Sequence, residues 1–339
     1  MRPPVPNTLA RALRGFFTEY LPAVRGASPH TILSYRDALV LLLRFLAGYK
    51  GRAVVDLDLE DLEPDGVLAF LEHLEQHRGN CTATRNARLA AVHAFARYAA
   101  ARHPEAIDPC QRLLAVPFKR GTQPTVEYLE AREIQALLEA PDRRSAQGRR
   151  DHALLFTLFN TGARVQELLD IRARDLQLER PFLVRLHGKG RKERLCPLWS
   201  QTAQVLRALL EETGLDAASS ERIFRNQRGD PLTRFGVRYL VRKYAKLAQA
   251  AVPTLGRKRV HPHTLRHTTA VHLLQAGVDL ISISHWLGHA SVETTNRYAT
   301  VDLEMKRAAL AKAGPIGDDP LPVGNWRSET SILEWLEAL

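Results

Sequence analysis

The sequence predicts two domains: an all-α helical bundle, followed by an α+β domain that is mainly helical and contains a small antiparallel sheet. The chain has 339 residues, which is more than one hydrophobic core usually serves. Its first third shows only helical periodicity, whereas strand-like segments joined by a glycine-containing turn lie between Ile171 and Leu198. A segment rich in proline, glycine and basic residues separates the two patterns.

The first domain is predicted over residues 1–115 as a bundle of four amphipathic helices. Ser28 followed by Pro29 is typical of a helix start, and apolar residues then recur at helical spacing. A second clear helix follows Thr82 and has apolar residues along one face. Weaker helical patterns cover residues 8–20 and 64–77.

Residues 116–124 break this periodicity and are predicted to be an interdomain linker. The second domain is predicted over residues 125–312. Two strands, LVRL and RLCPL, flank a polar hairpin turn at 187–193, and a third strand near 171–178 completes the sheet. Helices are expected around this sheet at 130–139, 150–160, 163–169, 200–213, 234–250, 262–276 and 279–287.

Residues 313–339 are predicted to be a C-terminal tail. Its first part is rich in proline, glycine and aspartate, and its end, ILEWLEAL, is a short apolar segment. A helix of this length is not stable alone, so it has to dock on its own domain or on a neighbouring protomer.

The charge indicates an anionic partner, with nucleic acid as the first candidate. The net charge is +11, and the excess is concentrated, because residues 171–260 alone hold 20 basic and 8 acidic side chains, a net charge of +12. Such concentration favours a binding surface over a general need for solubility.

The cysteines and the N-terminus exclude other classes. Cys81, Cys110 and Cys196 are far apart and show no CxxC spacing, which argues against a disulfide framework and a thiolate zinc cluster. The first residues lack the apolar region of a secretory signal, and no apolar stretch is long enough to span a bilayer. We therefore expect a cytoplasmic protein.

Two segments carry basic residues in positions that suit phosphate chemistry. Gly162 closes one predicted helix and Arg164 begins the next, so a guanidinium lies near free backbone N–H groups. Lys189 lies between two glycines at the hairpin tip, where its flexible stem and titratable ammonium suit a mobile proton donor. Taken alone, an arginine such as Arg164 is more often an ordinary surface residue. A lysine such as Lys189 can equally be a nonspecific phosphate contact.

Two further segments combine histidine, arginine and tyrosine. In HPHTLRH, Pro262 starts a helix and places His263 and Arg266 on one face, where they can hold a phosphate and manage a proton. In LGHAS and the following TTNRY, polar neighbours precede Tyr298, nine residues after His289. The many histidines also raise a metal site as an alternative, although no HExxH spacing or carboxylate pattern supports it.

The ordered set GAR, HGKG, HTLRH, LGH and RY resembles the tyrosine recombinases, also called the phage-integrase family, and the resemblance extends over residues 8–312. It implies a catalytic set made of Arg164 as the first arginine, Lys189 of the β-hairpin, the pair His263 and Arg266, His289 as the second histidine, and Tyr298 as the nucleophile. It further implies a supporting role for Glu167, and it identifies the first domain as a SAM-like core-binding domain.

The resemblance also implies a function. Such an enzyme cleaves and rejoins a double-stranded DNA recombination site through a 3′-phosphotyrosine, without metal, cofactor or ATP. Four protomers on two sites exchange strands through a Holliday junction, which integrates, excises or resolves a mobile element or replicon in the nucleoid. An accessory DNA-bending protein or a partner recombinase is a further expected partner. The residues expected to contact DNA are Arg85, Arg88, Lys119, Arg120, Arg191, Lys192 and Arg194.

Two other classes of function remain open at this point. The first is a DNA-binding regulator with an inactive site, against which the intact set of six residues argues. The second is a metal-dependent nuclease, which a chelator would distinguish.

Overall fold

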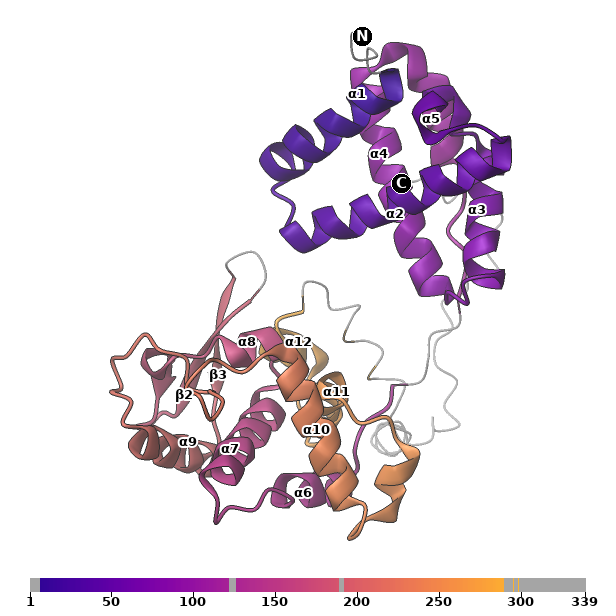
Figure 1. The fold of residues 1–339 in the computed structure, drawn as a ribbon. Helices are drawn as coiled ribbons and strands as arrows, with labels where there is room; N and C mark the ends of the chain where they lie inside the picture. The colour runs from indigo at the N-terminus through magenta and orange to yellow at the C-terminus, as the bar shows by residue number, and fades with distance from the viewer. Residues whose placement is uncertain (1–6, 122–125, 189–191, 290–294, 296–297, 299–339) are drawn as a thin grey trace, which may run out of the picture. The chain divides into compact units, whose positions relative to one another are not determined.

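The computed structural model describes residues 7–121, 126–188, 192–289, 295 and 298. The chain divides into two compact units, Met1–Gln123 and Pro124–Leu339 (Figure 1). Each unit has its own hydrophobic core. Among the helices in the described part of the chain, none combines the length and apolar character that crossing a membrane requires. The predicted tail at 313–339 lies outside the described residues.

In residues 7–121, the described part of the first unit, all the regular structure is helical. Ser28 caps α2 by accepting a 3.2 Å hydrogen bond from the backbone of Thr31, and Gly51 ends that helix in the left-handed conformation. An aromatic cluster around the fully buried Phe16 and Phe95 joins the start of the unit to the helix that carries Phe95. The elements are α1 (Thr8–Gly15), a π-helical segment (Phe16–Val24), α2 (Pro29–Lys50), α3 (Pro64–Gln76), α4 (Thr82–Arg102) and α5 (Ile107–Leu114).

Helix α5 was not predicted from the sequence. The predicted linker, 116–124, also includes residues that pack on the first unit. Helix α5 has eight residues and buries only two of them, which is too few for a periodic signal. After it, Val116 is buried, the Phe118 ring packs on His93, and the backbone of Lys119 exchanges hydrogen bonds with the Asn86 amide. Residues 116–121 therefore pack on the first unit.

The second unit is built around α7. Every residue from Asp151 to Thr161 is buried, because α7 packs against α6, α8, α9 and α11. Its N-terminus is capped by Ser145, and its C-terminus is at Gly162. The helices are α6 (Ala131–Glu139), α7 (Ala146–Thr161), α8 (Val165–Leu169), α9 (Ser200–Thr213), α10 (Arg234–Ala248), α11 (Pro262–Gln275) and α12 (Leu280–Leu287).

A three-stranded antiparallel sheet in the order β1-β2-β3 completes this unit, with β1 at Leu176–Gln177, β2 at Leu183–His187 and β3 at Glu193–Pro197. Val184 pairs with Cys196 and both face the core, whereas the flanking Arg185 and Leu195 face outward. The predicted fold class is thus confirmed. The strand predicted near 171–178 is shorter, because the Asp175 carboxylate accepts from the Arg172 backbone and closes a 3₁₀ turn.

Candidate functional site

The ends of α7 and α12 meet the start of α11, and this junction positions the residues singled out by the sequence. Gly162 and Gly288 both have positive φ, +56° and +64°, which favours glycine. A Cβ on Gly162 would lie 2.5 Å from a methyl group of Leu287. The close approach of these two helix ends therefore depends on a residue without a side chain.

Arg164 stands at the N-cap of α8 and reaches across to the end of α12. Its Nη1 donates to Glu167 Oε1 at 2.8 Å, and its Nη2 donates to the carbonyl of Gly288 at 3.1 Å. Its side chain is 39% exposed, so the guanidinium is oriented by the protein and still accessible. This is the arrangement that a phosphate-binding arginine needs.

Arg266 is buried one turn into α11. Its Nη1 donates to the Gly162 carbonyl at 2.6 Å and its Nη2 to the Leu287 carbonyl at 2.7 Å. Burial, followed by repulsion from Arg164, lowers the pKa of Arg266 to about 10. The guanidinium is therefore still charged at neutral pH, and it lies in a setting where an anion would relieve the cost of its burial.

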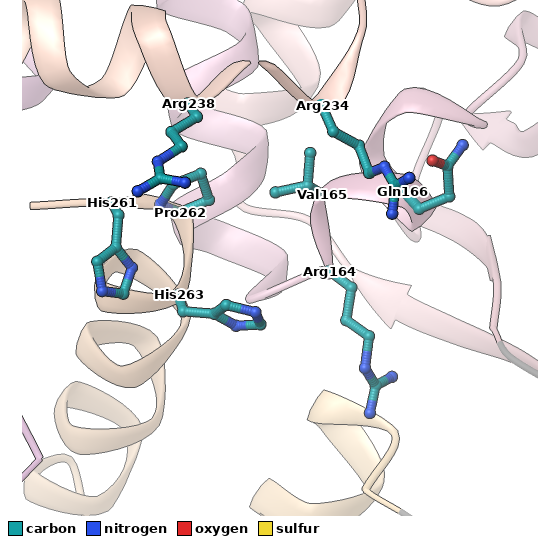
Figure 2. Close-up of a pocket in the computed structure, with 8 residues that line it drawn as sticks. All are labelled: Arg164, Val165, Gln166, Arg234, Arg238, His261, Pro262 and His263. Carbon is teal, nitrogen blue, oxygen red and sulfur yellow. The ribbon is translucent and has the colours of Figure 1, made fainter. Parts of the chain in front are cut away.

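A pocket of about 500 Å³ opens beside Arg164, and Figure 2 shows His263 extending from the start of α11 toward it. Of its eight lining residues, three are arginine, two are histidine and none carries a negative charge. An anion such as a phosphodiester therefore fits it electrostatically. The lining residues are Arg164, Val165, Gln166, Arg234, Arg238, His261, Pro262 and His263.

Tyr298 is fully buried, and its hydroxyl lies 2.8 Å from Nδ1 of His267. Its ring packs in a small apolar cluster with α11 and α12 residues, including Val271 and Leu287. The His289 ring lies parallel to it, with centroids 6.4 Å apart, and Nδ1 of His289 is 2.7 Å from the Thr295 hydroxyl. The structure thus brings Tyr298 beside His289 and places its hydroxyl against a histidine to which the sequence reading gave no role.

Glu167 joins two arginines. It is 4% exposed, and its Oε2 accepts from Arg194 Nη2 at 2.7 Å and from the Arg164 backbone at 3.0 Å. Burial acts to raise the pKa of Glu167, but the hydrogen bond and charge of Arg194, together with Arg164, lower it below the ordinary value. The carboxylate is therefore ionised at neutral pH.

Arg194 was expected to contact DNA, and the structure corrects this expectation. Its side chain is only 13% exposed, and its guanidinium donates to Glu167 and to the Trp286 carbonyl. Two of its three guanidinium nitrogens are therefore engaged with the protein. Its neighbour Lys192 is exposed, whereas Lys189 and Arg191 lie outside the described residues.

Arg85 requires the same correction. It is 7% exposed, and its guanidinium donates to Asn86 and to the Pro117 carbonyl, because the 116–121 segment covers this side of α4. Arg88 is half-buried. Lys119 and Arg120 are exposed, and Lys119 forms an ion pair with Glu75 at 2.9 Å.

Two arginines of the pocket were not predicted from the sequence. Arg234 and Arg238 are four apart on α10, and this i, i+4 spacing was the available signal. As for the metal alternative, the described residues contain no group of three or more His, Cys, Asp or Glu side chains arranged to hold an ion.

Comparison with known proteins gave matches along most of the chain. The profile of the phage integrase family matches residues 127–305, and that of the phage integrase N-terminal SAM-like domain matches residues 16–103. The integrase/recombinase y4rC of Sinorhizobium fredii is 42% identical over 332 residues, 98% of each chain. Tyrosine recombinase XerC of Pelobacter propionicus is 34% identical over 307 residues, 90% of this chain and 96% of its own. The crystal structure of XerH site-specific recombinase shares the fold, with a TM-score of 0.65 at 24% identity over 84% of this chain and 80% of that one.

Proposed function

Because this chain belongs to the phage integrase family, we propose that it is a site-specific DNA recombinase whose nucleophile is Tyr298. The observation that carries the residue assignment is the convergence of Arg164, Arg266 and His263 at one site. They come from two segments about a hundred residues apart in the sequence, and the ends of α7 and α12 bring them together. Tyr298 packs with Leu287 at the same end of α12 that both arginines contact, and this proximity supports its role as the attacking group.

In the proposed reaction, the Tyr298 oxygen attacks a DNA phosphorus, forming an O–P bond while the bond to the 5′-oxygen breaks. His263 takes the tyrosine proton, and Lys189 gives a proton to the departing 5′-oxygen, which leaves as a free hydroxyl. The resulting 3′-phosphotyrosine keeps the phosphodiester energy, so the reverse attack by a 5′-hydroxyl rejoins DNA without ATP.

Charge that develops on the nonbridging oxygens is met by Arg164 and Arg266, with His289 donating a further hydrogen bond. The carbonyl and carboxylate contacts of both guanidiniums orient them before DNA arrives, so little reorganisation accompanies the reaction. Tyr298 has to exchange its His267 contact for the phosphate, which makes its release a step that DNA binding is expected to drive.

The proposed partner is a double-stranded recombination site, bound by both units. Two crystal structures of XerH site-specific recombinase, including the one compared above, are complexes with difH DNA substrate, which supports this partner. We propose that four protomers assemble on two sites and pass through a Holliday junction, with an accessory DNA-bending protein or a partner recombinase where the element requires one. Such a protein acts in the cytoplasm, at the nucleoid.

A recombination assay in cells tests this function. Two copies of the DNA that flanks the gene are placed on a plasmid with the full-length protein, and junction products are amplified and sequenced. We expect recombinant junctions with the natural chain and none with Tyr298→Phe. Junctions that form equally with both proteins would overturn the assignment of the nucleophile.

A further inference from the structure

Three arginines bind three consecutive carbonyls at the end of α12. The Trp286 carbonyl accepts from Arg194 Nε at 2.9 Å, the Leu287 carbonyl from Arg266 Nη2 at 2.7 Å, and the Gly288 carbonyl from Arg164 Nη2 at 3.1 Å. The arginines come from β3, α11 and the N-cap of α8, respectively. One helix end therefore gathers cationic side chains from three elements.

The end of a helix is well suited to this. The last carbonyls of a helix have no partner within it, and the helix dipole gives them partial negative charge. Gly288 and His289 satisfy the His285 and Ser284 carbonyls through their backbone N–H groups, which leaves the next three carbonyls for the guanidiniums. The arrangement uses the carbonyls as fixed acceptors that orient each arginine.

Gly288 makes room for Arg194 in this arrangement. A Cβ on Gly288 would lie 2.9 Å from Arg194 Nη1 and 3.2 Å from its Cζ, so the guanidinium lies directly against the glycine backbone. Arg194 is thus fitted to the end of α12 by steric contact as well as by its hydrogen bond to Trp286.

The other side of Arg194 leads to Arg164. Its Nη2 donates to Glu167 Oε2, and the second oxygen of the same carboxylate accepts from Arg164 Nη1. Glu167 is 4% exposed, so Arg194 supplies the counter-charge that keeps this buried carboxylate in place opposite Arg164. Of Arg194, Glu167 and Arg164, only Arg164 also lines the anion pocket.

We propose that Arg194 is a positioning residue: it holds Glu167 against the end of α12, and Glu167 in turn presents Arg164 to the scissile phosphate. Arg194 also ties β3 to the helix end that precedes His289. This inference rests on the proposed function, since it assumes that Arg164 binds the phosphate. It assigns no DNA contact to Arg194 itself.

The test uses the full-length chain and a nicked duplex that carries the recombination site, which traps the covalent adduct. Arg194→Met removes the charge and keeps most of the side-chain volume, and Arg194→Lys keeps the charge but cannot donate to Trp286 and Glu167 in the same geometry. The matched control is Arg185→Met, an exposed arginine on the neighbouring strand β2. For each variant we would measure adduct formation rate, DNA affinity as a function of salt, and thermal midpoint.

We expect Arg194→Met to slow adduct formation at least tenfold, with DNA affinity within about twofold of the natural chain and an unchanged salt dependence. The adduct formation rate of Arg194→Lys should lie between those of Arg194→Met and the natural chain. Arg185→Met should form the adduct at the rate of the natural chain. If Arg194→Met does not fold, Arg194→Lys carries the measurement. A flatter salt dependence would make Arg194 a DNA contact, and an unchanged rate in a folded variant would remove it from any role; either result overturns the proposal.

A double-mutant cycle distinguishes positioning through Glu167 from general structural support. If Arg194 acts through Glu167, Arg194→Met in a Glu167→Gln background should cost no more than about twofold beyond Glu167→Gln alone. If the rate losses of the two single variants multiply fully in the double variant, Arg194 does not act through Glu167. Absence of any adduct with the natural chain, by contrast, would refute the proposed function itself, so the two failures are distinguishable.

Discussion

Helices α4 and α10 both carry arginines at helical spacing, yet the structure uses them in opposite ways. On α4, Arg85 is buried under the 116–121 segment and donates to protein acceptors. On α10, Arg234 and Arg238 are exposed and line the anion pocket, and Arg242 continues the same face toward a second basic hollow. Regular spacing therefore shows that basic residues share one face of a helix. Whether that face is exposed depends on which other segments of the same chain pack against it.

The largest contrast should come from two buried arginines, one in each unit. Arg266→Gln should lower the rate of strand cleavage by about 10²–10³-fold, the scale of losing one preorganised donor at a developing oxyanion. Arg85→Gln should leave that rate within about twofold and lower the thermal midpoint instead, because the hydrogen bonds from the buried guanidinium to Asn86 and to the Pro117 carbonyl are lost. Single-turnover cleavage and thermal melts would check both. Equal cleavage defects would mean that Arg266 acts only through stability.

Lys189→Ala should slow cleavage of ordinary DNA by about 10²-fold, the usual contribution of a general acid. A substrate with a 5′-phosphorothiolate at the scissile position should restore most of the rate, since sulfur leaves without needing a proton. The comparison of the two substrates isolates proton donation from phosphate binding. A defect of the same size on both would exclude Lys189 from this role.

The exposed arginines of α10 should contribute to DNA affinity. Replacing Arg238 and Arg242 together by Gln should weaken DNA binding about tenfold and reduce the salt slope by about 2, because two phosphate contacts are lost. Arg85→Gln should leave the slope unchanged, as its guanidinium faces protein. Titrations at several salt concentrations measure both. A reduced slope for Arg85→Gln would reverse the contrast between the two helices.

The smallest expected effect is that of a chelator. Cleavage in EDTA should stay within about twofold of the untreated rate, because arginine, histidine and lysine side chains fill the charge-stabilising and proton-transfer roles in the proposed reaction. The rate is followed with and without added Mg²⁺ or Zn²⁺. Collapse in EDTA followed by recovery with either ion would favour the metal-dependent nuclease instead.

The sequence predicted the architecture well, because its signals are local. The start of α2 at Ser28 and Pro29, the hairpin, and α9 at 200–213 follow from caps, proline and periodicity within one segment. The chain order of the motifs also indicated the family. Each of the structural features, and each motif taken singly, is decided by residues close together in the sequence.

The errors about the DNA-contacting residues arise where distant segments decide the outcome. Arg194 and Arg85 were expected on the surface, but the end of α12 and residues 116–121 cover them, and neither contact leaves a local signal. The His267 contact with Tyr298 spans thirty-one residues and depends on how α11 and the tyrosine meet. Single-sequence patterns show which side chains can act together, whereas burial is determined only in the assembled fold.

The most direct test of the account is the identity of the DNA-linked residue. The full-length chain is incubated with a nicked duplex carrying its recombination site, the covalent complex is digested, and the peptide bearing the nucleotide is sequenced by mass spectrometry. The account predicts a 3′-phosphate ester on Tyr298 and no adduct with Tyr298→Phe, although that variant should still bind the duplex. An adduct mapped to another residue, or one that persists in Tyr298→Phe, would contradict it.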